Sequence, residues 1–507
     1  MYRARVYAVA GLTTALLAAL STPATGWDNP KAHTPPRAKP HRRSAAEGVP
    51  PLPLPATPLR RTERKRQPSP AGLVGMINFS EERFEIVEGE RRRVSAFPTT
   101  QIDIERLMHV ANRRLGIRYR YVRTTLGRFS WDPRELPLLY VTGWTPMPRL
   151  SDPMIERLRR YLYDGGTLVV HAQCGRKEFV ETARREIRRL FPDRELAPID
   201  TDSPLLHAHY DIEEMRVRKD DEPFKSMKPY LEAVYLGCRP AVIFSPIDLN
   251  CGWDVVNHPI EGGILYHQND AARLGVNIVA TTLANFEYAR AFSARRVYHQ
   301  QGEETRDELV IGQLAHNGDW DPTPHALPNL MKYVQQNTTL NVQFKRKVLD
   351  PAQAEVFEHP VLYMTGLRDF RLSDTQVERL RQYLSGGGVL IADAAAGRKA
   401  FDVAFRREIA RILPDAELEV VPIASPVYQM PFKIRRVDYT PLAQARHVGL
   451  EAPVLEGISI DGQLAVVYSR LSLSNGWEEL GFAYADGYQS DDALRIGVNL
   501  LAYAMTH

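Results

Sequence analysis

Cysteine is scarce in this chain of 507 residues, which contains only Cys174, Cys238 and Cys251. So few cysteines exclude a small scaffold that several disulfides hold together. An odd number also leaves at least one thiol without a partner inside the chain. Cys238 and Cys251 flank an apolar segment, residues 241–244, that we predict to be a strand. Because a strand would hold them apart, we expect these two cysteines not to pair.

Long uncharged apolar runs are also missing, apart from residues 6–20 near the start of the chain. That run follows Arg3 and Arg5, and the small residues Ala24 and Gly26 precede Trp27. This order predicts a secretory signal peptide over residues 1–26. The alternative is an N-terminal membrane anchor, for which the run is short. We therefore expect a soluble mature chain without a transmembrane span, exported to the periplasm or the extracellular space.

Several nucleotide, metal and hydrolase motifs are absent. The sequence has no Walker loop, no Gly-x-Gly-x-x-Gly, no His-Glu-x-x-His and no Gly-x-Ser-x-Gly. Each of these motifs places particular groups around a phosphate, a metal or a nucleophile. Without them the sequence predicts no cofactor and no resident metal.

Positive charge is concentrated before residue 71. The net charge is +4, but residues 27–70 carry ten basic and three acidic residues, and Arg3 and Arg5 add two more positive charges, so residues 71–507 have a net charge of −5. An acidic folded part argues against nucleic-acid binding. Residues 27–70 also contain eleven prolines, so we predict a disordered linker. The linker is either a solvated spacer or a contact for an anionic envelope polymer or lipid.

One stretch of sequence occurs twice, at an almost constant offset. Residues 138–143 read Leu-Leu-Tyr-Val-Thr-Gly, and residues 361–366 read Val-Leu-Tyr-Met-Thr-Gly. Further matched pairs follow in order: Leu-Ser-Asp at 150–152 and 372–374, Gly-Gly at 165–166 and 387–388, Gly-Arg-Lys at 175–177 and 397–399, and Arg-Arg-Glu-Ile at 184–187 and 406–409. A period of roughly 200 residues is too long for a solenoid, so each copy should be a domain.

Within each copy, apolar strand-like runs alternate with helical apolar stripes. This alternation predicts an α/β fold with a mainly parallel sheet. We place the first domain at residues 71–295 and the second at residues 296–507. Ser373 and Gln376 have the spacing of a capping box, which the first copy lacks because Met154 stands at the matched position.

The repeated motifs resemble those of the bacterial family called domain of unknown function 4159. The resemblance covers most of residues 71–507 in two copies. It implies a flavodoxin-like arrangement of the class I glutamine amidotransferase-like kind for both domains. It implies no established activity or substrate.

Cys174 and His171 are the candidate catalytic residues. Cys174 follows a predicted strand and precedes a predicted helix, where a helix N-terminus would lower the pKa of a thiol. His171 stands three residues before it and could accept its proton. The second copy has Asp393 and Ala396 at these positions, so the thiol chemistry would be confined to the first domain.

The repeated Gly-Arg-Lys triplet is the candidate site for an anion. Each triplet should open a helix just past the carboxyl end of a strand, where backbone N–H groups favour an anionic ligand. The alternative is that the cations pair with nearby acids. The residues concerned are Gly175, Arg176, Lys177, Gly397, Arg398 and Lys399.

Two loose groups of possible metal ligands complete the candidates. His207, His209, Asp211 and Glu213 alternate, as ligands on one face of a strand would. His258, Glu261 and His267 form the other group, and neither matches a tight metal signature.

We interpret the chain as an uncharacterised exported protein with a non-catalytic ligand-binding or interaction role in the cell envelope. The partner would be a small anionic ligand or an envelope protein. A Cys174/His171 hydrolase or transferase, and a metal-dependent envelope hydrolase, remain the alternatives.

Overall fold

The computed structural model describes residues 70–77, 82–87, 89–95, 102–254, 262–292, 309–339, 342 and 346–506. The predicted signal peptide and nearly all of the predicted linker lie outside these residues. The chain divides into two units, residues 1–70 and residues 71–507. The second unit contains both sequence copies, and each copy forms an α/β domain built on its own sheet.

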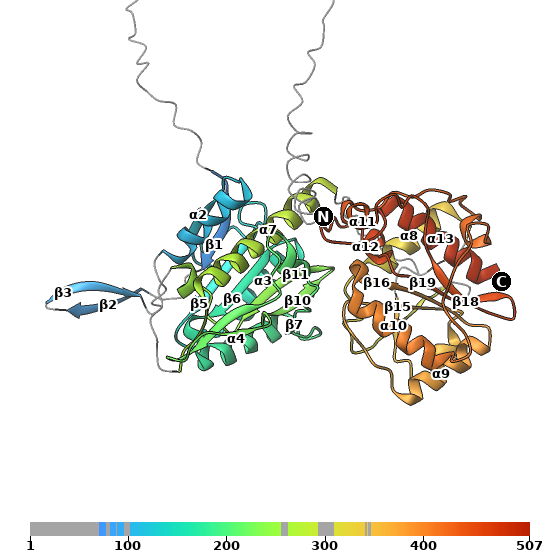
Figure 1. The fold of residues 1–507 in the computed structure, drawn as a ribbon, viewed down its shortest axis with the longest axis horizontal. Coiled ribbons are helices and arrows are strands. Elements are labelled where there is room, and N and C mark those ends of the chain that lie inside the picture. The colour runs from blue at the N-terminus through green and yellow to red at the C-terminus, as the bar shows by residue number, and fades with distance from the viewer. Residues whose placement is uncertain are drawn as a thin grey trace, which may run out of the picture. The chain divides into compact units, whose positions relative to one another are not determined.

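The first domain is built on a seven-stranded sheet with the order β4-β1-β5-β6-β11-β10-β7 (Figure 1). The first five strands in this order run parallel, and β10 pairs antiparallel with both β11 and β7. β5 and β6 are buried along their whole length, as expected for central parallel strands covered on both faces. The strands are β1 (Gly72–Ile77), β4 (Arg120–Thr124), β5 (Leu138–Gly143), β6 (Thr167–Ala172), β7 (Ala197–Pro198), β10 (Glu232–Leu236) and β11 (Arg239–Ser245).

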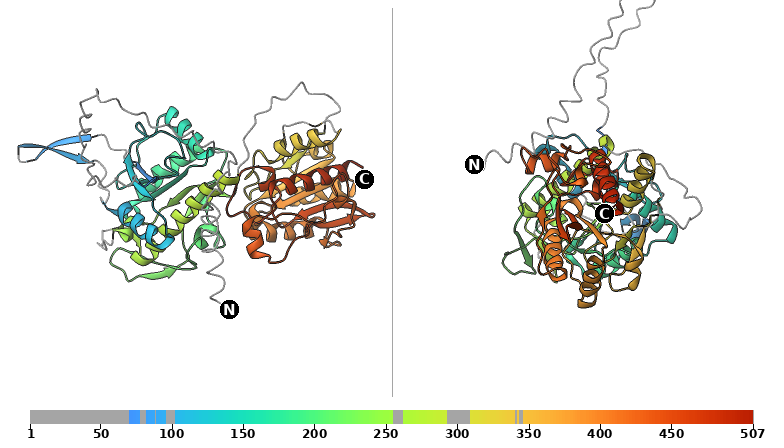
Figure 2. Two further views of the ribbon diagram at one scale, coloured as in Figure 1. Left: turned by 90° about the horizontal axis from the view of Figure 1, so that it is seen from above. Right: turned by 90° about the vertical axis from the view of Figure 1, so that its right-hand side faces the viewer.

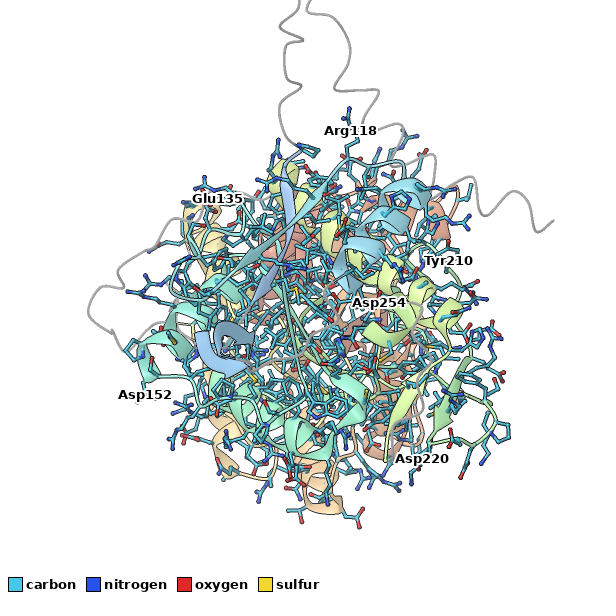
Figure 3. All side chains as sticks on the ribbon, turned by 90° about the vertical axis from the view of Figure 1, so that its left-hand side faces the viewer. Arg118, Glu135, Asp152, Tyr210, Asp220 and Asp254 are labelled. Carbon is cyan, nitrogen blue, oxygen red and sulfur yellow. The ribbon has the colours of Figure 1, made fainter. Side chains whose placement is uncertain are left out.

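Helices cover both faces of this sheet. α2 (Asp103–Leu115) and α7 (Gln268–Phe292) pack together on one face, where Leu107 and Leu274 belong to one apolar core. α3 (Asp152–Tyr163) and α4 (Lys177–Leu190) bury a second core on the other face. Figure 3 shows Asp152, at the start of α3, and Tyr210, beside the α2–α7 layer, on opposite sides of the sheet. The domain therefore has three layers around two cores.

Short elements complete the first domain. η1 (Gln173–Gly175), α5 (Pro204–His207) and α6 (Asn250–Trp253) are single turns. β8 (Met215–Lys219), β9 (Lys225–Met227) and β12 (Ile264–Tyr266) form a small sheet, and β2 (Glu82–Val87) pairs with β3 (Glu90–Ser95).

The second domain repeats this plan, with the strand order β14-β13-β15-β16-β19-β18-β17. Figure 2 gives two further views of the strands and helices of both domains. The strands of the second domain are β13 (Gly312–Leu314), β14 (Lys347–Leu349), β15 (Val361–Gly366), β16 (Val389–Ala394), β17 (Glu419–Val420), β18 (Glu456–Ile460) and β19 (Gln463–Ser469). Its helical elements are α8 (Ala326–Asn337), η2 (Ala354–Glu358), α9 (Asp374–Ser385), η3 (Ala395–Gly397), α10 (Lys399–Ile412), η4 (Pro426–Tyr428), α11 (Pro441–Arg446), α12 (Ser474–Trp477) and α13 (Ser490–Thr506).

The repeated Arg-Arg-Glu-Ile motif has a structural role. The carboxylate of Glu186 is 1% exposed; it accepts the backbone N–H of Leu150 at 3.1 Å and pairs with Arg189 at 2.6 Å. Glu408 makes the same contacts, to Leu372 and Arg411. A buried carboxylate is stable only with such partners. The motif thus ties α4 to the start of α3, and α10 to the start of α9.

Candidate functional site

The two residues that we predicted for catalysis, His171 and Cys174, both lie at the carboxyl edge of the first sheet. His171 lies near the end of β6, Cys174 lies in η1 directly after it, and α6 follows β11, the neighbouring strand. The carboxyl ends of parallel strands share one edge of a sheet, which is where α/β proteins usually bind ligands. All three cysteines are free and buried.

Cys174 contacts an acid and a second thiol. Its backbone N–H donates to the Asp248 carboxylate, which also accepts the N–H of Cys251 at 2.9 Å. The Cys251 thiol donates to the same carboxylate at 3.2 Å. The ligand atoms of Cys174, Asp248 and Cys251 all lie within 4.8 Å of one another. Two causes raise the pKa of the Cys251 thiol: the larger is its hydrogen bond with Cys174, and the next is its burial. The cluster therefore places two thiols beside one carboxylate.

His171 is engaged elsewhere. Its Nε2 lies 2.5 Å from the hydroxyl of Tyr140, and that hydroxyl is 3.1 Å from the Asp103 carboxylate. Burial lowers the pKa of His171 to about 3, so the ring is neutral, and burial raises the pKa of Asp103 to about 6. If Tyr140 donates its one proton to Asp103, then His171 donates to Tyr140 through Nε2. Among the described residues, the contacts of His171 therefore orient Tyr140 and not Cys174.

The second copy keeps the architecture and exchanges the polar groups. Asp393 replaces His171, and its carboxylate accepts the Tyr363 hydroxyl at 2.6 Å and the backbone N–H of Ser474 at 2.9 Å. Ala396 replaces Cys174, and its N–H donates to Asn475 Oδ1 at 2.6 Å. The acid of the second copy, Asp393, therefore lies on strand β16, whereas the acid of the first copy, Asp248, lies in the loop after β11.

The two Gly-Arg-Lys turns begin α4 and α10, as predicted, and neither helix start has a side-chain cap. The guanidinium of Arg176 lies over the ring of Trp144, 4.0 Å from its centre, and that of Arg398 lies over Tyr235 at 5.7 Å. Lys177 and Lys399 are exposed. The arginines thus pack on aromatic rings, and anion binding at these turns stays a prediction.

The alternating residues His207, His209, Asp211 and Glu213 do not lie on a strand, so the arrangement considered for metal ligands is not formed. Residues 204–207 form α5, and residues 208–214 contain no strand, because Pro204 favours the first turn of a helix. His207 contacts Asp211 and the carbonyl of Thr201, and the ring of His209 packs on Tyr210. His258 and Glu261 lie outside the described residues.

A hollow of about 550 Å³ opens at the same edge of the second sheet. Arg470 and Leu471 directly follow β19, Arg406 lies on α10, and His447 follows α11. Its lining combines the cations Arg406 and Arg470, the acid Glu456 and the ring of His447 with the apolar Leu450, Val454 and Leu471. Arg470 is exposed and makes no ion pair with any described residue. This hollow, unlike the buried thiol cluster, is open to a ligand.

Asp248, Cys251 and Arg470 were not among the site residues predicted from the sequence. The two copies differ at all three positions, with Ser472, Asn475 and Pro246 as the matched residues. Differences of this kind, read against an otherwise repeated pattern, were the available signal.

Cys238 has a different environment from the other two cysteines. It lies in the turn between β10 and β11, and the Asn475 side chain donates to its Sγ at 2.9 Å. It shares a small apolar cluster with Leu367, Ala395, Ala396, Phe482 and Ala485. Strand β11 separates it from Cys251, as the sequence predicted.

The match to a protein-family model agrees with the duplication. The family described as "Domain of unknown function (DUF4159)" matches residues 98–283 and again residues 310–505. No curated protein matches the chain. Among solved structures, the crystal structure of a ThuA-like protein from Bacteroides uniformis ATCC 8492 matches with 9% identity and a TM-score of 0.20, over 41% of this chain and 95% of that chain.

Proposed function

This chain belongs to the family of domain of unknown function 4159, and we propose that it is an exported, non-catalytic protein of the cell envelope that binds a small anionic ligand. The binding site is the hollow at the carboxyl edge of the second sheet. The signal-peptide pattern of residues 1–26 supports the export, and no helix among the described residues is long and apolar enough to cross a membrane.

The observation that carries the proposal is the exposed guanidinium of Arg470 at the rim of a hollow that can admit a small molecule. An arginine binds a carboxylate or a phosphate through two parallel hydrogen bonds. Arg406 is less available, because it already pairs with Asp402 at 2.9 Å and with Glu456 at 2.5 Å. Arg470 is therefore the residue expected to meet the anion.

The rest of the lining restricts the ligand. Leu450, Val454 and Leu471 offer apolar surface beside the cation, so a carboxylate with a short apolar part fits better than a fully polar anion. Glu456 also lines the hollow and would repel a second negative charge placed next to it.

Binding is favoured over catalysis because the residues with reactive side chains are inaccessible. Cys174 is 2% exposed and His171 is 0% exposed. The described contacts of Cys174 are to Asp248 and Cys251, and those of His171 are to aromatic residues. A nucleophile has to reach its substrate, and neither of these buried side chains is placed to do so, although the Asp248 carboxylate lies beside Cys174.

The test compares two charge reversals in the second domain. Binding of short-chain carboxylates and of inorganic phosphate is measured by calorimetry on the wild type, Arg470→Glu, Arg470→Lys and Lys399→Glu. We expect Arg470→Glu to abolish binding, Arg470→Lys to weaken it, and Lys399→Glu to leave it unchanged. Loss of binding in Lys399→Glu alone would transfer the site to the Gly-Arg-Lys turn, and no binding by the wild type would overturn the proposal.

A further inference from the structure

The thiols of Cys174 and Cys251 lie in contact, although 76 residues separate them in the sequence. Their sulfur atoms are within 4.8 Å of each other, and the two residues are 2% and 6% exposed. Cys174 belongs to the turn after β6, and Cys251 to the turn after β11. The pair thus spans two segments that only the folded sheet brings together.

The second copy shows what this position does when no thiol is present. There the N–H of Ala396 donates to Asn475 Oδ1 at 2.6 Å, which bridges the same two turns with a hydrogen bond. The backbone is also the same, since Cys174 has φ 53° and Ala396 has φ 56°. Residues at these positions therefore connect η1 with α6 in the first copy and η3 with α12 in the second. In the first copy, each of the two connected turns carries a thiol.

A metal site explains the cluster less well. Structural zinc takes four protein ligands, and this group contains three. Both oxygens of Asp248 already accept backbone N–H groups, from Cys174 and from Cys251. In addition, the turn keeps its shape in the second copy, where Ala396, Ser472 and Asn475 replace all three ligands.

We propose that Cys174 and Cys251 form a disulfide. Each thiol loses its proton and the two sulfurs join, while the two electrons pass to a disulfide oxidant, which is reduced to two thiols. Because both sulfurs are buried in the fold, the bond forms before the two turns close over it. Export, as proposed above, would supply a compartment with such an oxidant. The pairing does not depend on the ligand-binding hollow.

Mapping of the disulfide after refolding tests the proposal without relying on export. The full chain is refolded in a buffer of reduced and oxidised glutathione, denatured, alkylated without reductant and digested. We expect mass spectrometry to find the peptides of Cys174 and Cys251 linked and lighter by two hydrogens, and Cys238 alkylated. Alkylation of both Cys174 and Cys251, or a link that includes Cys238, would overturn the proposal.

Two variants and a zinc assay separate the alternatives. The double variant Cys174→Ala/Cys251→Asn carries, at these two positions, the residues of the second copy, Ala396 and Asn475. We expect the thermal midpoint of this variant to be insensitive to reductant. Wild type and Cys238→Ala should both lose thermal stability when reductant is added. One tightly bound zinc per chain, together with free thiols at Cys174 and Cys251 after denaturation, would replace the disulfide by a metal site.

Discussion

At the scale of single residues, His316 shows how a hydrogen-bond pattern fixes a charge state. Its Nε2 lies 2.9 Å from the carbonyl of Thr365, and the backbone N–H of Gly318 donates to its Nδ1 at 3.0 Å. Nε2 therefore carries the proton and Nδ1 accepts. Protonation of Nδ1 would set two N–H groups against each other. Burial is the main cause that lowers the pKa of His316 from 6.5 to about 4.

A pH dependence of stability follows from this shift. Between pH 4 and pH 6.5 the unfolded chain binds a proton that folded His316 does not bind, so the free energy of unfolding falls as pH is lowered through this window. Because His316 is only partly buried, we expect a loss of about 1 kcal/mol between pH 7 and pH 5. Urea unfolding of wild type and His316→Gln at both pH values measures it.

The comparison with the variant is needed because other groups titrate in the same range. The lowered pKa of His171 acts in the same direction as that of His316, whereas the raised pKa of Asp103 acts in the opposite direction. Subtracting the pH dependence of His316→Gln removes both contributions. An equal pH dependence in wild type and variant would show that His316 binds a proton as easily in the folded chain as in the unfolded chain.

At the scale of helices and strands, the helix starts follow from local sequence. α9 begins with the predicted capping box: the Gln376 N–H donates to Ser373 Oγ at 3.3 Å, and the Ser373 N–H donates to Gln376 Oε1 at 2.9 Å. Ser151, at the matched position before α3, caps nothing with its side chain. Such details depend on residues three apart, so the sequence predicts them well.

The two helices offer a matched test of this capping box. We expect Ser373→Ala to lower the free energy of unfolding by about 1 kcal/mol, because it removes the acceptor for one N–H group at the start of α9. Ser151→Ala should change it by less than about 0.5 kcal/mol. Chemical unfolding of the two single variants checks the difference, and equal losses in both would argue against a role for the box.

The arrangement of strands in the sheet was harder to predict than the strands themselves. The sequence predicted a strand at residues 241–244, which the structure shows as part of β11. Nothing local shows that β11 lies beside β6 or that β10 runs antiparallel to it. That order puts Asp248 and Cys251 next to Cys174. The thiol cluster therefore depends on contacts between distant segments, and no spacing rule could reveal it.

At the scale of the whole molecule, the duplication predicted the architecture but not the difference between the copies. Matched strands, helices and glycines give two sheets with the same order. The polar residues at the two carboxyl edges diverged, so each edge has its own network around Asp248 or Asp393. A residue repeated in both copies, such as Glu186 with Glu408, proved to hold the fold together. Function is better sought where the copies differ, as at Arg470 and Cys251.

Cys238 reports on the contact between the two sequence copies within residues 71–507. It is 6% exposed, next to Phe482 in the same apolar cluster, and burial raises the pKa of its thiol to about 12. Alkylation requires the thiolate, so we expect Cys238 in the folded Cys174→Ala/Cys251→Asn chain to react far more slowly than in the unfolded chain. Adding Phe482→Ala should increase the rate several-fold, because it opens the cluster around the sulfur. Adding Val448→Ala, at a residue that is 89% exposed, should not change the rate. Labelling of the folded chain as fast as the unfolded one would mean that the copies do not cover Cys238 in solution.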